Sequence, residues 1–210
     1  NDGAAAAYRI ALKLTPDDPE IHSNLGNALR DLGRHDESMT AYGQALALNP
    51  EFAEAHNNLG TVQQELGKLN DATASFDEAI RLDDGNTQAY NNLGISLLDM
   101  NDLVQAEAAL RNALAIEPDY AEAHFNLSRV LLMAEDFEDG WKQNEWRWLC
   151  NDFPSTWREF PQAMWQGEDL ADKTILVWSE QGVGDEIMFA NTLPELVQNA
   201  EKVIIECNDR

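Results

Sequence analysis

The sequence is poor in basic residues, with 14 Lys and Arg against 38 Asp and Glu and a net charge of −24. So acidic a surface repels nucleic acid and anionic membranes, so neither is expected as a partner. A neutral or basic protein or peptide is the expected binding partner. The acidity has a second explanation, adaptation to a saline habitat, which composition alone does not separate from the first.

Cysteine is scarce as well. Cys150 and Cys207 lie far apart, with no CxxC or Cys/His spacing, so neither a disulfide framework nor a zinc site is predicted. A reducing compartment, the cytoplasm, is therefore the expected location. No apolar run approaches the roughly 18 residues that a membrane-spanning helix needs. The chain starts at Asn1 rather than at Met, and we expect it to be a fragment of a longer protein.

Tryptophan is absent before Trp141, and the part of the chain that lacks it is repetitive. The motifs SNLG, NNLG, NNLG and FNLS recur with a step of 34 residues and end at Gly26, Gly60, Gly94 and Ser128. A large residue and an alanine follow in the same register, as in Tyr42 with Ala45 and Phe76 with Ala79. Two helical segments per period predict helical hairpins, which must stack because none can bury its apolar face alone.

This pattern resembles the tetratricopeptide repeat, including the closing prolines Pro16, Pro50 and Pro118. The resemblance implies an all-α fold, a right-handed superhelical solenoid of antiparallel helix pairs over residues 1–150. The expected boundaries are a half repeat at 1–18, complete repeats at 19–52, 53–86 and 87–120, and a degenerate repeat at 121–150.

An asparagine precedes the leucine of every motif: Asn24, Asn58, Asn92 and Asn126. On a helical wheel, Asn58 falls about 200° from His56, away from the packing face that includes Leu59 and Gly60. The four asparagines are therefore predicted to line the concave wall of the solenoid, where amide donors and acceptors could hold an extended peptide backbone. The predicted groove also includes Asn27, Asn57, Asn91, Glu54 and Glu65.

The repeats of the eukaryotic O-linked N-acetylglucosamine transferase are similar, with an inner asparagine ladder at the matching position. That similarity implies a protein-interaction scaffold that binds an extended peptide or a partner helix. The alternative is that the amides form hydrogen bonds within the solenoid or only solvate it. Since Arg30 and Arg129 are the only basic residues near the groove, the clamp by which some tetratricopeptide domains hold a C-terminal carboxylate is not expected.

Three histidines, His22, His56 and His124, also recur in register, with Tyr90 in the remaining repeat. They fall on the packing face, one in each repeat. Neighbouring packed helices lie about 8–10 Å apart, whereas zinc needs nitrogens about 2 Å from one ion. We therefore expect no metal site, and we interpret the histidines as residues that fill volume between helices.

All six tryptophans lie in the last third of the chain. Trp141 and Trp148 are seven residues apart, which places them on one face of a helix. The aromatic-rich connector 151–172 is interpreted as a rigid joint to a second domain, with sugar stacking on an exposed ring as the alternative. From 173 to 210, a buried strand TILVWSE, a glycine turn QGVGD, a helix and a second strand KVIIECN predict a βαβ unit.

The stretch KTILVWSEQGVGDEIMFANTLPEL resembles the opening of heptosyltransferase-like glycosyltransferases, as found in bacterial fusions with tetratricopeptide repeats. The resemblance implies that Asp185 is a candidate catalytic base and that Gly182 and Gly184 shape its loop. A helix N-cap is the alternative role for Asp185.

The second hypothesis for function is thus the substrate-presenting part of a GT-B-type glycosyltransferase. A nucleotide-sugar donor would bind only to a longer parent protein, and this fragment is expected to have neither a cofactor nor transferase activity. The unpaired edges of the truncated sheet could join two copies of the chain.

Overall fold

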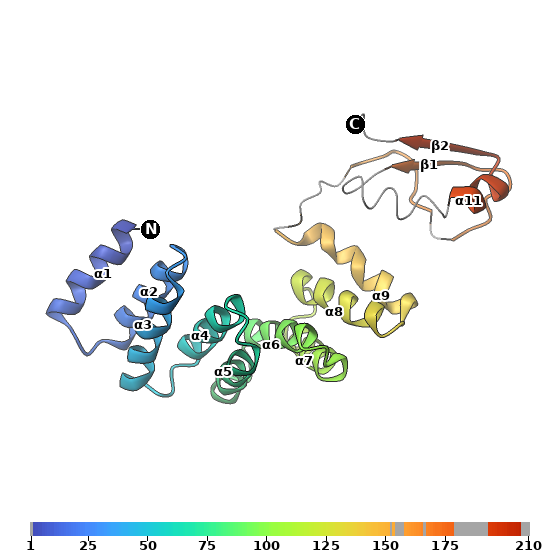
Figure 1. The fold of residues 1–210 in the computed structure, drawn as a ribbon. Helices are drawn as coiled ribbons and strands as arrows, with labels where there is room; N and C mark the ends of the chain where they lie inside the picture. Colours follow the sequence, from blue (N-terminus) through green and yellow to red (C-terminus); the bar gives the residue numbers. More distant parts are fainter. Residues whose placement is uncertain (1, 152, 154–157, 166, 179–192, 207–210) are drawn as a thin grey trace. The chain divides into compact units, whose positions relative to one another are not determined.

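Figure 1 shows the computed structural model, which describes residues 2–151, 153, 158–165, 167–178 and 193–206. It divides into two compact units, 1–150 and 151–210, which are described separately. The first unit is helical, as the 34-residue period predicts. Its elements are α1 (Asp2–Leu14), α2 (Pro19–Arg30), α3 (His35–Leu48), α4 (Ala53–Glu65), α5 (Leu69–Leu82), α6 (Thr87–Asp99), α7 (Leu103–Ile116), α8 (Ala121–Met133), α9 (Phe137–Asn144) and the 3-10 helix η1 (Glu145–Leu149).

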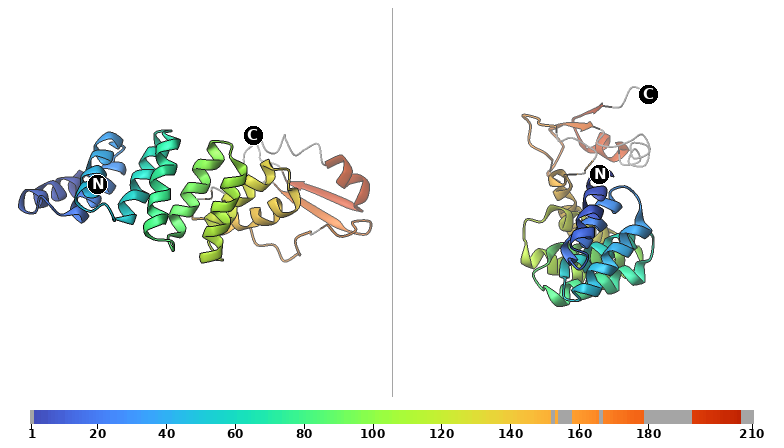
Figure 2. Two further views of the ribbon diagram at one scale, coloured as in Figure 1. Left: turned by 90° about the horizontal axis from the view of Figure 1, so that it is seen from below. Right: turned by 90° about the vertical axis from the view of Figure 1, so that its left-hand side faces the viewer.

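The helices pair as α2 with α3, α4 with α5, α6 with α7 and α8 with α9, and each pair packs on the next. The two views of Figure 2 show this stacking of successive helices along the first unit. We call α2, α4, α6 and α8 the first helices of their repeats, and α3, α5, α7 and α9 the second helices. None of the described helices has the length and apolar character needed to cross a bilayer.

In three of the four repeats, a glycine on the first helix faces a large side chain on the second helix. A Cβ added at Gly60 would lie 2.7 Å from Cε1 of Phe76, and one at Gly26 would lie 2.6 Å from Cε1 of Tyr42. Both large side chains are completely buried. The fourth repeat replaces this contact with a polar one, since Asn144 Nδ2 donates to Ser128 Oγ at 3.3 Å. The glycines therefore set how closely the helices of a pair approach.

The turn within each pair has the same backbone geometry in all four repeats. A residue two or three positions after the end of each first helix has a positive φ: 70° at Gly33, 71° at Gly67, 60° at Asn101 and 64° at Glu135. The next N–H bonds back to the helix, as from Lys68 N to Gln63 O at 2.8 Å. This is the Schellman arrangement, in which glycine is favoured and asparagine is tolerated. Glu135 is the residue least suited to its position.

Replacing Glu135 with glycine is expected to raise the free energy of unfolding by about 0.5–1 kcal/mol, because a side chain is disfavoured in the left-handed region. The matched control is Glu138→Gly in α9, which should lower the same free energy by about 1 kcal/mol because glycine weakens a helix. Urea denaturation of the two variants measures both values. Destabilisation of similar size at the two sites would contradict the role assigned to the turn.

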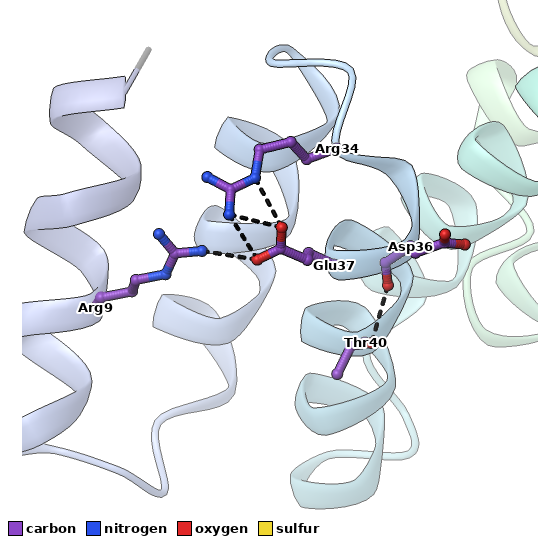
Figure 3. A network of polar contacts seen from close by, with 5 residues as sticks. All are labelled: Arg9, Arg34, Asp36, Glu37 and Thr40. Atoms are coloured by element: carbon purple, nitrogen blue, oxygen red, sulfur yellow. Dashed lines mark hydrogen bonds and ion pairs between the residues drawn. The ribbon is translucent and has the colours of Figure 1, made fainter.

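An ion-pair network joins α1 to the first complete repeat (Figure 3). The carboxylate of Glu37 accepts from Arg34 Nε at 2.8 Å and from Arg9 Nη2 at 3.0 Å. All three side chains are well exposed, so each pair contributes little to stability.

The second unit contains a parallel pair of strands, β1 (Thr174–Trp178) and β2 (Lys202–Glu206), with the helix α11 (Leu193–Asn199) between them in the chain. The register runs from Thr174 opposite Lys202 to Trp178 opposite Glu206. Arg158 forms an ion pair with Glu206 and lies over the rings of Phe160 and Trp178. A crossover connection between parallel strands agrees with the expected βαβ arrangement.

The aromatic residues after Gly140 differ from the expectation in one respect. Because α9 ends at Asn144 and η1 follows, Trp141 and Trp148 are not on one face of a continuous α-helix. Trp146 stacks on His124 with ring centroids 3.9 Å apart, and it thereby caps the last repeat. Trp141 is 53% exposed.

Candidate functional site

We call Asn24, Asn58, Asn92 and Asn126 the asparagine line. It runs along the first helices, but its members differ in exposure. Asn24 on α2 is exposed, and Asn58 on α4 and Asn92 on α6 are half-buried. Asn126 on α8 is only 8% exposed. The line is therefore accessible at its N-terminal end and is closed at the fourth repeat.

The neighbouring asparagines, Asn57 and Asn91, do not face the open side as expected. They are 3% and 5% exposed, and their side-chain oxygens are used by the following repeat. Asn92 Nδ2 donates to Asn57 Oδ1 at 3.2 Å, and Asn126 Nδ2 donates to Asn91 Oδ1 at 2.9 Å. These amide pairs bridge successive first helices. Burial explains the pairing, since a buried amide without a partner is costly.

Removing Asn91 should show what such a pair contributes. In Asn91→Ala, Nδ2 of Asn126 loses its buried acceptor, and the free energy of unfolding is expected to fall by about 1–3 kcal/mol. The double variant with Asn126→Ala should cost less than the sum of the single variants, as a thermodynamic cycle from urea melts would show. Asn112→Ala, on the exposed side of α7, is the control with little effect. Additive losses at Asn91 and Asn126 would contradict the pairing.

The remaining residues of the predicted groove have different surroundings. Asn27 is half-buried, and its Oδ1 accepts from the hydroxyl of Tyr42 at 2.5 Å. Burial raises the pKa of Tyr42 to about 12, so the phenol remains a neutral donor well above neutral pH. Glu54 and Glu65 are exposed, and Glu65 Oε2 lies 3.3 Å from His35 Nδ1. The open side of the first helices thus offers amides at one end and carboxylates along its length.

The predicted glycosyltransferase loop, with Gly182, Gly184 and Asp185, lies outside the residues that the structure describes. Within the described residues, no three His, Cys, Asp or Glu side chains come together as a metal site.

The recurrent histidines have a role that the sequence analysis missed. In three repeats the imidazole Nε2 lies within hydrogen-bond distance of a proline carbonyl six residues earlier in the chain. The pairs are His22 with Pro16 at 2.8 Å, His56 with Pro50 at 3.0 Å and His124 with Pro118 at 2.8 Å. The sequence contained a signal for this pairing, because the proline and the histidine are lost together. In one repeat Asp84 stands in place of the proline, and Tyr90 stands in place of the histidine. These bonds hold the turn that leads from one repeat into the next.

Comparison with known families confirms the predicted repeats. A model described as TPR repeat matches residues 1–33 and 26–67, and models described as tetratricopeptide repeat match residues 53–86 and 97–140. Protein FlbA of Caulobacter vibrioides is 38% identical over 71 residues, which cover 33% of this chain and 12% of FlbA. The chain thus spans a small part of that relative.

Solved structures show the same fold, which confirms the predicted fold class. A crystal structure of MamA superposes with a TM-score of 0.64 at 23% identity, over 69% of this chain and 85% of MamA. PilF of Pseudomonas aeruginosa gives a TM-score of 0.64 at 20% identity, over 69% of this chain and 66% of PilF. The first TPR of Spaghetti (RPAP3), bound to the HSP90 peptide SRMEEVD, gives a TM-score of 0.55 at 21% identity, over 56% of this chain and 94% of that domain.

Proposed function

Because the first unit is built of tetratricopeptide repeats, we propose that it is a protein-interaction scaffold that holds an extended, neutral or basic peptide against its first helices. The observation that carries the proposal is the accessible part of the asparagine line, formed by Asn24, Asn58 and Asn92. These three residues replace the four of the initial expectation, because Asn126 is buried.

The amide pairing changes how such a peptide would be held. Asn92 Nδ2 donates to Asn57 Oδ1 at 3.2 Å and to Thr61 Oγ1 at 3.5 Å, so Oδ1 of Asn92 is the atom that remains for a ligand N–H. The pairing also fixes the orientation of the side chain before a ligand arrives, which lowers the entropy cost of binding. We therefore expect Asn92 to act as an oriented acceptor of peptide N–H groups.

The charge of the ligand follows from the carboxylates on the same side. Glu20, Glu54 and Glu65 are exposed on α2 and α4. The TPR of Spaghetti is similar in fold and is bound to a peptide with three acidic side chains, SRMEEVD. We propose the opposite preference here, since like charges would meet across the interface.

Two short peptides test this proposal. Fluorescein-labelled SRMEEVD and the charge-reversed SEMKKVK, amidated at its C-terminus, are titrated with the whole chain at low ionic strength. The reversed peptide is expected to bind at least tenfold more tightly, and the difference should shrink in high salt because charges on exposed groups are screened. The triple variant Asn24→Ala, Asn58→Ala, Asn92→Ala should weaken binding at least tenfold.

The matched control carries Asn70→Ala and Asn112→Ala, two exposed asparagines on second helices. It should bind like the unmodified chain. If the asparagine triple variant bound the reversed peptide as tightly as this control, the asparagine line would not be the binding site. Equal affinity for the two peptides would remove the charge preference.

A second candidate function is the presentation of a substrate to a sugar-transfer domain in a longer protein. The parallel pair β1 and β2, with α11 between them, favours it because a Rossmann-like domain begins in this way. Asp185 would then serve as the catalytic base, and a nucleotide sugar would be the donor. Sequencing the gene beyond Arg210 tests this idea, since an early stop codon or a region unlike a second Rossmann half would eliminate it.

A further inference from the structure

Large apolar side chains are exposed where the first helices end and the second helices begin. Leu66 and Met100 follow α4 and α6, Met133 ends α8, and Val104 and Phe137 lie at the starts of α7 and α9. Their exposed fractions are 38%, 42%, 54%, 80% and 58%, respectively. We call these five residues the turn edge. The turns themselves are closed by backbone hydrogen bonds and by residues with positive φ, so the turns do not require these side chains.

The turns that carry the turn edge belong to successive repeats that pack on one another, so we treat the turn edge as one strip. The first helices contact one another, α4 with α6 and α6 with α8, and packed helices are separated by about 8–10 Å. The turn of one repeat also reaches the next, since His35 Nδ1 at the start of α3 lies 3.3 Å from Glu65 Oε2 at the end of α4. Clustered exposed apolar residues of this kind mark interaction surfaces.

Carboxylates flank the strip. Asp31 directly follows α2, and Glu65 and Asp99 end α4 and α6; Met133 takes the equivalent position on α8. An acidic side chain at the C-terminal end of a helix faces the negative end of the helix dipole, which is unfavourable. Arg30 lies 4.0 Å from Asp31 and His35 lies 3.3 Å from Glu65, which offsets part of this cost in the first two repeats. Positions where a sequence breaks such local rules are where functional demands are expected.

We infer that the turn edge is a docking surface for a basic amphipathic helix of a partner protein. Apolar residues seven apart on such a helix are separated by about 10.5 Å, which is close to the distance of about 8–10 Å that packed helices generally keep. Lys and Arg beside them would meet the three carboxylates. A second copy of this chain is a poor occupant, because its net charge of −24 would oppose close approach. This surface goes beyond the proposed peptide groove and shares only Glu65 with it.

A designed peptide tests the inference. The probe is an 18-residue fluorescein-labelled peptide with leucines at positions 3, 10 and 17, lysines on both flanks and alanine elsewhere. It is titrated with the whole chain at low salt, beside a scrambled peptide of equal composition. The edge variant carries Met100→Ser, Met133→Ser and Phe137→Ser. The matched control carries Ile10→Ser, Leu14→Ser and Leu48→Ser, which are 60%, 82% and 42% exposed and lie outside the turn edge.

The edge variant is expected to bind the probe at least tenfold more weakly than the unmodified chain. The affinity of the matched control for the probe should be within twofold of that of the unmodified chain. The scrambled peptide should bind more weakly than the probe, and the asparagine triple variant should bind the probe normally. Equal binding by the edge variant and the matched control would overturn the inference. A dimer of the unmodified chain in sedimentation velocity, dissociated by the edge variant, would also overturn it by assigning the strip to a second copy.

Discussion

Replacing Phe76 with alanine is expected to lower the free energy of unfolding by about 3–5 kcal/mol, the range for large aromatic deletions in a packed core. Phe76 is completely buried on α5 and is part of a cluster that includes Leu93, Leu97 and Ala106. The deletion leaves a cavity between two repeats, and Gly60, which faces the ring, has no side chain to fill it.

Urea denaturation followed by circular dichroism measures the effect, and hydrogen exchange locates it. Because repeats interact chiefly with their neighbours, the loss of protection relative to the unmodified chain should be larger for the amides of α4 to α6 than for those of α2. Ala74→Ser, an exposed change on the same helix, serves as the control. A loss below about 1 kcal/mol in Phe76→Ala would mean that the second helix is not held by this ring.

Replacing Gly60 with alanine is expected to destabilise the protein by about 1–3 kcal/mol, although alanine is the better helix former. The added Cβ would lie 2.7 Å from the ring of Phe76, in a position with no room to relax. Overpacking therefore outweighs the gain in helix propensity. The same argument applies to Gly26 and Gly94, which face Tyr42 and Leu110.

The matched control for Gly60 is Gly43→Ala. Gly43 lies within α3, and nothing comes within 4 Å of a Cβ added there. The same substitution is thus expected to raise the free energy of unfolding by about 1 kcal/mol, since only the propensity term remains. Urea melts of the two variants give the sign of each change. A gain in stability at Gly60 would show that Phe76 can move away at little cost.

The sequence predicted the fold well because the repeat supplies redundant information. Leu25, Leu59 and Gly60 recur with one period, so a single interpretation accounts for every helix pair in the first unit. The glycine and aromatic positions could also be paired from the sequence, because small and large residues must alternate where two helices pack closely. Prediction was weaker at the end of the repeats, where Asn144 replaces the aromatic residue and α9 is short.

The candidate site was predicted only in part. A helical wheel gives the direction of Asn58 relative to its own helix, but it contains no information about the preceding repeat. Asn57 and Asn91 looked like residues of the groove from their positions beside Asn58 and Asn92. They are buried because the next repeat covers them, and an asparagine of that repeat donates a hydrogen bond to each side-chain oxygen.

The sequence by itself thus determined the repeating helical hairpins, the acidic character of the surface and the positions of four asparagines. Each of these depends on composition or on contacts within one period of 34 residues. Only the tertiary structure decided which asparagines remain accessible and which apolar side chains stay exposed at the turns. Those properties depend on the distance between neighbouring repeats, which side-chain volumes across the whole interface set together.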